Sequence, residues 1–459
     1  MSDRLFQLLN DAQHRLDAGF SHLPPNPAPP LDEAASAILH QVADRLQDNY
    51  PYAHPLYAGQ MLKPPHPIAR AAYALAMSVN PNNHALDGGR ASSSMEVEAV
   101  SALAKMFHLP QHLGHLSSGG TFANLEALWV AGQLTPGKAI AASDQAHYTH
   151  SRISSVLGLP FHAVPSDASG RMGLAALEHL LETSNIGTVV VTLGTTAIGS
   201  VDPLDQILLL QQRYNFRIHV DAAYGGYFTL AANLTPETRA AFDAIPHADS
   251  IVIDPHKHGL QPYGCGSILF RDPAVGRLYK HDSPYTYFSS KDLHLGEISL
   301  ECSRAGASAV ALWATQQLLP YVPGGAFAQG LESSHTAALE LYRRLAQSNH
   351  FFTPSHPPQL DIVFWAAKAP TPEASSALAQ AIFDEAATRD LHLALAKLST
   401  RFFPHDTWKD LSRSNQETTV TCLRSVLMKP EHLLWLDQLW QRLQAAAEKV
   451  TVNTPLEPT

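Results

Sequence analysis

A lysine between two histidines is the residue of this sequence best suited to covalent chemistry. Lys257 lies in the segment 254–259, between His256 and His258, directly after the apolar, β-branched residues 250–253. Where a buried strand ends, loss of hydration lowers the pKa of an ammonium group, so the amine becomes available to form a Schiff base. The alternative is a solvated lysine at a strand end, and this short segment alone does not separate the two.

Residues 114–121 are suited to binding an anion. They include Gly119 and Gly120 and lead directly into an apolar, helical sequence. The unpaired N–H groups of a helix start, together with the hydroxyls of Ser118 and Thr121, would bind a phosphate. The segment has neither Gly-x-Gly-x-x-Gly nor Gly-Lys-Ser/Thr, so it predicts neither a dinucleotide site nor a nucleoside-triphosphate loop. The alternative is a tight turn with an ordinary helix cap.

An acidic residue follows another predicted strand, 217–220. Asp221 is succeeded by small residues, among them Ala223. A carboxylate at this place can keep a heterocyclic nitrogen protonated through a charge-assisted hydrogen bond, while Ala223 leaves room for a flat ring. The arrangement would be an electron sink. The alternative, an aspartate that caps a helix, is disfavoured because Gly225 and Gly226 begin a helix poorly.

Histidines offer a further possibility at the strand end 143–151. His147 is placed to stack on an aromatic cofactor, and the alternative is a capping or core histidine. The chain has 25 histidines, two pairs of which are close in sequence, so a metal site also has to be considered. We expect no metal, because His-Glu-x-x-His is missing and the histidines are not grouped with carboxylates. No Gly-x-Ser-x-Gly supports a hydrolase.

Alternating strands and helices would bring these segments together. From about residue 115 to 275, apolar, β-branched runs alternate with helical ones, which predicts an α/β fold with a mostly parallel sheet covered by helices on both faces. Ligands collect at the carboxyl ends of such strands. The predicted strands are 139–143, 160–164, 188–193, 217–220, 250–253 and 267–270, and the predicted helices are 121–133, 147–157, 173–183 and 204–214.

Three units are expected along the chain. Residues 1–50 form an N-terminal helical arm, 51–320 a large cofactor-binding domain, and 321–459 a smaller C-terminal α+β domain. In the large domain, the polar run 80–94 predicts a loop before a helix at 95–106. The C-terminal domain is expected to contain helices 326–348, 374–389 and 431–448 and strands 361–366, 391–396 and 419–427.

Composition narrows the class of ligand and the compartment. The 459 residues are 45% hydrophobic and carry a formal net charge of -10 without a basic run, which argues against nucleic acid or an anionic membrane and favours a small-molecule substrate. Cys265, Cys302 and Cys422 are too widely spaced to indicate a disulfide framework, which fits the cytoplasm. We expect neither a signal peptide nor a membrane anchor.

Together these motifs resemble the pyridoxal-phosphate-dependent decarboxylases of glutamate, aromatic amino acids, tyrosine and aspartate, over roughly residues 50–430. Segment 254–259 followed by 264–271 is most similar to the tyrosine/aspartate branch, and 301–307 resembles that branch and sphingosine-phosphate lyase. The resemblance implies fold type I, the architecture of aspartate aminotransferase, and a homodimer in which two subunits build each site. It implies pyridoxal 5'-phosphate as cofactor and decarboxylation of an L-amino acid to its amine.

The resemblance also implies roles for individual residues. Lys257 would form the Schiff base with the cofactor, Asp221 would hold the pyridine nitrogen, and His147 and Ala223 would lie against the two ring faces. The other residues expected to bind the cofactor are Ser118, Gly119, Gly120, Thr121, Thr196 and His256.

Two further assignments concern the substrate. Arg424 lies in an otherwise apolar or small-residue strand that resembles the Arg-bearing strand of glutamate decarboxylases, and it is expected to bind the substrate carboxylate; the alternative is a structural ion pair. Tyr285 and Tyr287 lie on a predicted loop. In the decarboxylases that the chain resembles, a tyrosine of the corresponding loop reaches the partner subunit's cofactor and protonates the carbanion, so one of the two is the expected general acid. The alternative is that both pack at a subunit interface.

Some features leave the outcome of the reaction open. Phe122 and the run 224–226 depart from the best-known members, and no clear match to their long mobile loop is found. The alternatives are a carbon–carbon lyase, a decarboxylation-coupled oxidative deaminase, and a non-catalytic scaffold of the same fold. The scaffold is disfavoured because it would need neither Lys257 nor Asp221.

Overall fold

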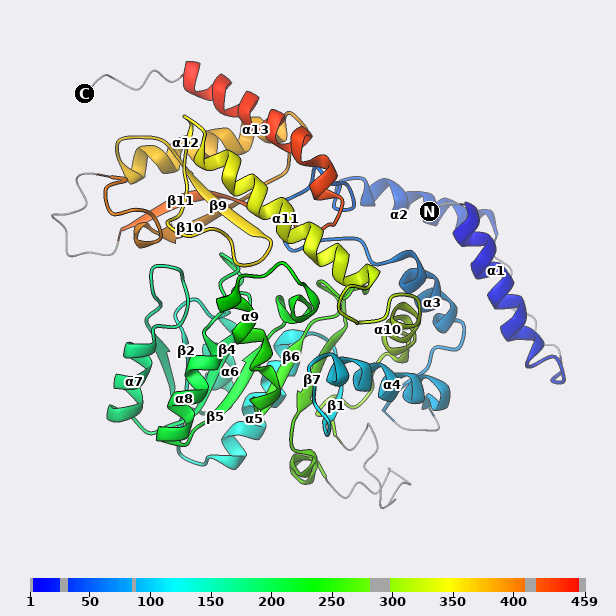
Figure 1. Ribbon diagram of the computed structural model, residues 1–459. Coiled ribbons are helices and arrows are strands. Elements are labelled where there is room, and N and C mark those ends of the chain that lie inside the picture. The colour runs from blue at the N-terminus through cyan, green and yellow to red at the C-terminus, as the bar shows by residue number, and fades with distance from the viewer. Residues whose placement is uncertain (1–2, 25–31, 85–87, 281–297, 409–417, 454–459) are drawn as a thin grey trace.

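Two sheets organise the chain, as Figure 1 shows. The computed structural model describes residues 3–24, 32–84, 88–280, 298–408 and 418–453. In the larger sheet the strand order is β1-β7-β6-β5-β4-β2-β3. Its strands are β1 (Leu113–Ser117), β2 (Ala139–Ser143), β3 (Phe161–Val164), β4 (Ile186–Thr192), β5 (Arg217–Asp221), β6 (Ser250–Ile253) and β7 (Gly266–Phe270).

The large sheet is parallel through its centre. Strands β3, β2, β4, β5 and β6 pair in parallel, whereas β7 is antiparallel to both β6 and β1. The prediction of a mostly parallel sheet is therefore confirmed. The helices that connect and cover it are α5 (Gly120–Leu134), α6 (Thr149–Val156), α7 (Leu174–Thr183), α8 (Leu204–Tyr214) and α9 (Pro236–Asp243).

The apolar character of β4 follows from burial on both faces. Val189 and Val191 pack in one core cluster with Leu177 of α7 and Ile207 of α8. Val190, which points to the opposite face, packs instead with Leu128 of α5. A strand covered on both sides has no solvent-facing position, so its sequence is continuously apolar rather than alternating.

The second sheet is antiparallel and has the order β10-β11-β9-β8. One face, with Val363 and Trp365 of β9, packs against the C-terminal helices, and the other, with Phe364, packs with Ile198 of the large unit. Its elements are β8 (Phe351–Phe352), β9 (Ile362–Ala367), β10 (Ala394–Ser399), β11 (Thr419–Val426), α11 (Ala326–Ala346), α12 (Pro372–Ala387) and α13 (His432–Asn453).

Two details of the sequence prediction were wrong. Residues 113–117, for which no strand was predicted, form the edge strand β1, whose register pairs Leu113 with Phe270. The helix expected from residue 95 begins earlier, because α4 spans Arg90–Met106. Ser92 lies inside this helix and donates to Asn83 Oδ1, so the serine run is helical and tied to the preceding loop.

The N-terminal helices extend away from both sheets (Figure 1). They are α1 (Asp3–Ala18) and α2 (Glu33–Leu46), and none of the residues of α2 is buried. The chain then returns to the body through α3 (Pro67–Met77), which packs on α10 (Gly306–Leu318). Across the described ranges, no helix combines the length and the apolarity that a membrane span requires.

Candidate active site

A single cavity lies where the carboxyl ends of β4, β5 and β6 meet the start of α5. Its volume is about 440 Å³. Thr192, Asp221 and Asp254 come from or directly after these three strands, as expected for a ligand site in a parallel sheet. Ten residues predicted to bind a cofactor line it together: Ser118, Gly119, Gly120, Thr121, His147, Thr196, Asp221, Ala223, His256 and Lys257.

Asp221 is the most heavily coordinated side chain in the cavity wall. Its Oδ2 accepts from His150 Nε2 at 2.8 Å and from Asn124 Nδ2 at 3.4 Å, and its Oδ1 accepts from the backbone N–H of Ala223 at 3.1 Å. Burial would raise the pKa of Asp221, but the hydrogen bond and charge of His150 outweigh this effect and hold the pKa below its ordinary value. The carboxylate is therefore ionised.

Buried side chains behind Asp221 continue this network. Asn124 Oδ1 accepts from His219 Nε2 at 2.7 Å, and His219 Nδ1 lies 2.8 Å from Ser250 Oγ. Burial lowers the pKa of His219 to about 3, so the ring is neutral. A neutral ring with its proton on Nε2 donates to Asn124 and accepts from Ser250, which satisfies both nitrogens.

Lys257 has a carboxylate partner that the sequence reasoning did not assign. Its Nζ lies 3.1 Å from Oδ2 of Asp254, the residue that directly follows β6 and is 2% exposed. The same carboxylate restricts position 120 to glycine, because a Cβ placed on Gly120 would lie 2.6 Å from Asp254 Oδ2. Asp254 thus lies between the amine and the start of α5.

The glycine loop supplies N–H groups to the cavity. Gly119 has φ +153°, outside the range that other residues readily adopt, and Gly120 and Thr121 are the first residues of α5. Their N–H groups have no acceptor within the helix, as an anion site requires. Ser118 N donates to Glu301 Oε2 at 3.0 Å, so its N–H group is already engaged.

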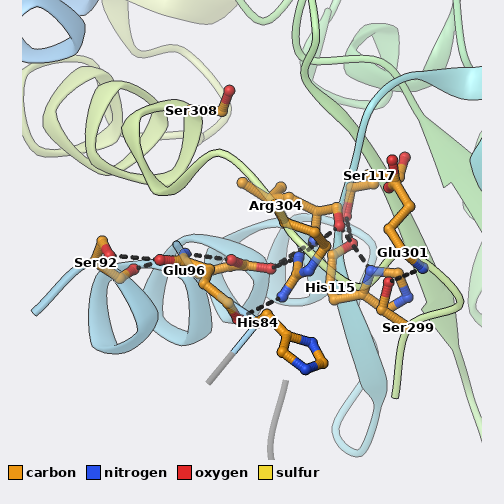
Figure 2. A network of polar contacts seen from close by, with 12 residues as sticks. His84, Ser92, Glu96, His115, Ser117, Ser299, Glu301, Arg304 and Ser308 are labelled. Atoms are coloured by element: carbon orange, nitrogen blue, oxygen red, sulfur yellow. Dashed lines mark hydrogen bonds and ion pairs between the residues drawn. The ribbon is translucent and has the colours of Figure 1, made fainter. Parts of the chain in front are cut away.

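A buried ion pair holds the strand that leads to this loop, as Figure 2 shows. Arg304 Nη1 donates to Glu96 Oε1 at 2.6 Å and to the carbonyl of Leu116 at 2.8 Å. Leu116 N donates back to Glu96 Oε1 at 2.9 Å. The segment after residue 300 therefore fixes β1 rather than lining the cavity.

Two histidines of the cavity wall have fixed orientations. Thr149 N donates to His147 Nδ1 at 3.2 Å, which leaves the proton on Nε2, and burial lowers the pKa of His147. His256 Nδ1 donates to the carbonyl of Cys265 at 2.8 Å, and burial lowers its pKa as well. Both rings are therefore neutral, with orientations set by the backbone.

Arg424 opens onto a second cavity that shares His147 and Thr196 with the first. The guanidinium donates to the carbonyls of Thr196 at 2.6 Å, Ala197 at 2.7 Å and Gly59 at 3.3 Å, and to Gln60 Oε1 at 3.4 Å. Within the described part of the chain, no carboxylate lies within 4.0 Å of it. The alternative of a structural ion pair has no partner among these residues.

Several residues of the cavity wall, and His150 outside it, were missed from the sequence. Asn124 lies one helical turn after Gly120, and His150 one turn after His147, so helical spacing from a predicted site residue was the available signal. The other missed residues of the wall are Phe122, Thr149, Thr192, Gly194, Tyr224 and Asp254. Tyr285 and Tyr287 lie outside the described residues. Among those described, no three His, Cys, Asp or Glu side chains gather as a metal site.

The cavity matches the chemistry of pyridoxal phosphate. It combines a backbone anion site, a carboxylate with an acceptor position, an amine, and a wall residue, Ala223, without a long side chain. Gly119 is needed for its positive φ, and Gly120 is needed because a Cβ there would lie 2.6 Å from Asp254 Oδ2. These are the groups that a phosphate, a ring nitrogen and an aldehyde require.

Comparison with known sequences points to the same cofactor. A family model described as the pyridoxal-dependent decarboxylase conserved domain matches residues 126–367. An L-tyrosine decarboxylase of Enterococcus faecium is 27% identical over 441 residues, which cover 72% of each chain. A Methanocella arvoryzae protein named "Probable L-tyrosine/L-aspartate decarboxylase" is 31% identical over 287 residues, or 61% of this chain and 72% of that one.

Comparison with solved structures confirms fold type I. The crystal structure of Oryza sativa TDC with PLP and tryptamine has a TM-score of 0.77 at 17% identity, covering 97% of this chain and 96% of that one. At this identity the likeness shows the fold. The Schiff-base lysine, the carboxylate and the stacking histidine expected from the sequence all fall within the residues matched by the family model.

Proposed function

The chain belongs to the family of pyridoxal-dependent decarboxylases, and we propose that Lys257 and Asp221 are the residues that bind and activate its cofactor. The enzyme is a carboxy-lyase that converts an L-amino acid to its amine. One observation carries the residue assignment. Asp221 ends β5, Lys257 follows the adjacent parallel strand β6, and both residues face one cavity.

Each residue then has a defined task. When bound, the cofactor accepts the electrons left behind as carbon dioxide leaves the substrate. Asp221 would keep the ring nitrogen protonated, Gly120 and Thr121 would bind the phosphate through their N–H groups, and His147 would contact the ring. Lys257 would supply the amine that holds the cofactor covalently at its aldehyde group.

Borohydride reduction of the enzyme with its cofactor tests the lysine. The reduced cofactor should map to the peptide that contains Lys257, and a Lys257→Ala variant should bind the cofactor without covalent attachment and show no turnover. Label on any other lysine would contradict the assignment. Measuring amine and carbon dioxide over a panel of L-amino acids then defines the substrate.

Arg424 is our candidate for the substrate carboxylate. Four of its five N–H groups have acceptors in the described part of the chain, which leaves one for a ligand. A buried guanidinium with carbonyl partners alone keeps its full positive charge, and burial lowers the pKa of Arg424. An incoming carboxylate would offset this cost of burial.

We also propose a homodimer. The helix α2 exposes Ile38 (58%), Leu39 (64%) and Leu46 (61%), more apolar surface than an isolated helix keeps in water. A second copy of the chain would cover it. Sedimentation analysis of the wild type and of Leu39→Asp should show a dimer and a shift toward monomer, respectively; a monomeric wild type would refute the proposal.

In such a dimer, Tyr285 or Tyr287 would act as the general acid that protonates the substrate carbon. Phenylalanine replacement of the responsible tyrosine should reduce amine formation while carbon dioxide release continues, whereas unchanged products in both variants would remove the role. We place the enzyme in the cytoplasm, since Cys265 and Cys422 are buried free thiols and Cys302 is an exposed one.

A further inference from the structure

A buried histidine lies behind the carboxylate that faces the cavity. His150, in the first turn of α6, is 0% exposed and is not part of the cavity wall. Its Nε2 lies 2.8 Å from Asp221 Oδ2. An ionised carboxylate only accepts, so Nε2 carries the proton and donates it. This is the shortest of the contacts that Asp221 makes.

Counting acceptor positions shows what remains for a ligand. An ionised carboxylate has about four lone-pair positions. Three of those on Asp221 are taken by His150, Asn124 and the backbone N–H of Ala223. About one is left, on a side chain that lines the cavity. The protein thus prepares the carboxylate for a single additional donor.

The donor behind the carboxylate decides where a shared proton lies. Between a carboxylate and a pyridine nitrogen, the proton favours the stronger base. A hydrogen bond donated to the carboxylate stabilises its charged form and makes it the weaker base. Burial acts in the opposite direction, because it favours a neutral carboxylic acid facing a neutral ring. The contact from His150 opposes this effect of burial.

We propose that His150 is a positioning residue that acts through Asp221 to keep the proton on the ring nitrogen of the bound cofactor. The inference rests on the proposed function, in which that nitrogen faces Asp221. Asn124 is the second side-chain donor to the same oxygen, at a longer distance. His150 therefore makes the larger contribution, although it contacts neither the cofactor nor the substrate.

Cofactor binding, rather than turnover, provides the test. Dissociation constants are measured for pyridoxal phosphate and for an analogue with C–H in place of the ring nitrogen. The wild type should bind the natural cofactor more tightly. In His150→Phe this preference should fall by roughly tenfold or more, the value of a hydrogen bond to a charged group. His150→Gln, which keeps an N–H donor, should retain most of it.

A matched control is available on α11. His335 is another buried histidine outside this cavity, and His335→Phe should keep the wild-type preference. With cofactor labelled by ¹⁵N in the ring, the nitrogen resonance should move toward the unprotonated position in His150→Phe and stay in place in the control. If His150→Phe does not fold, His150→Leu removes the donor with a smaller side chain and is measured in the same way.

The outcomes distinguish a failure of the role proposed for His150 from a failure of the proposed cofactor orientation at Asp221. If His150→Phe weakens the cofactor and the analogue equally, with the resonance unmoved, the histidine is only a packing residue and the inference fails. If the wild type itself shows no preference for the natural cofactor, the proposed orientation at Asp221 fails first. A lost preference in His150→Phe that His150→Gln restores supports both.

Discussion

Asp221 and Asp361 are both buried aspartates, with exposures of 5% and 0%. Each lies near a buried histidine, at 2.8 Å from His150 Nε2 for Asp221 and at 3.3 Å from His258 Nε2 for Asp361. In each case burial would raise the pKa of the carboxyl, and the histidine holds it below its ordinary value. Burial, partner type and charge state therefore do not distinguish them.

Their surroundings do distinguish them. Asp361 accepts from Tyr224 Oη at 2.5 Å and borders β9 of the small sheet, while Tyr224 and His258 belong to the large unit. It joins the two units and is not part of the cavity wall, whereas Asp221 keeps an acceptor position toward the cavity. A perturbed carboxylate becomes a functional candidate when part of it remains available to a ligand.

The same substitution at both positions should separate these roles most strongly. Asp221→Asn should lower kcat on the order of 10³-fold or more, because a neutral amide cannot hold the proton on the ring nitrogen that makes the cofactor an electron sink. Steady-state kinetics and circular dichroism are the measurements. A near-normal rate in a folded Asp221→Asn variant would make this strand end structural.

Asp361→Asn should destabilise the protein and leave kcat largely unchanged. Tyr224 and His258 would lose an ionised partner inside the protein, which should reduce the free energy of unfolding by about 2–4 kcal/mol. We expect kcat at a temperature where the variant is folded to remain within about tenfold of the wild type. Urea unfolding and kinetics on one preparation would test both, and a selective loss of kcat without loss of stability would contradict the contrast.

The sequence pattern was sufficient to predict the site residues whose position is set by the end of their own strand. Asp221 ends the run 217–221, in which Ile218 and Val220 are apolar, and Lys257 follows the apolar run 251–253; both runs are buried, parallel strands whose ends meet. Local order therefore predicted most of the central sheet, and together with the family resemblance it identified ten residues of the cavity wall. The edge strand β1 was not predicted, because its sequence, with Gly114 and His115, lacks an apolar run.

Partners distant in sequence could not be predicted in this way. Asp361 reaches Tyr224 across 137 positions, and Arg304 reaches Glu96 across 208. Such pairs depend on how the elements pack, which periodicity does not encode. His150 is an intermediate case, since its spacing from His147 was visible, but its contact with Asp221 depends on the placement of α6 beside β5.

Substitutions of Arg424 test whether this residue, at the boundary between the two units, binds the substrate or only stabilises the structure. Arg424→Met should lower kcat/KM by roughly 10- to 100-fold, mainly through KM, because a charge-assisted contact to the substrate carboxylate is lost. Arg424→Lys should recover part of the loss. If both variants lose stability and leave KM unchanged, Arg424 resembles Asp361 in joining the two units.

The smallest effect is expected in the pH dependence of stability. Burial lowers the pKa of His219 to about 3, and it also lowers the pKa of His258 beside Asp361. A histidine of this kind takes up a proton when the protein unfolds at a pH between its folded value and the unfolded value near 6.5. Its contribution to stability is therefore complete above about pH 6.5 and decreases as the pH falls.

Both networks should contribute to this pH dependence. Each such histidine contributes a slope of about 1.4 kcal/mol per pH unit. Removing it with His219→Gln should flatten the dependence of unfolding free energy on pH from about 6 to 4. His258→Gln should flatten it as well, because burial also lowers the pKa of His258. The slope is independent of how much each substitution destabilises the protein, so urea unfolding at a series of pH values isolates the titrating ring. Equal slopes in the wild type and His219→Gln would mean that the ring beside the Asp221 network is already charged at neutral pH or reaches solvent. In that case the neutral ring, which donates to Asn124 and accepts from Ser250, would be the wrong assignment for His219.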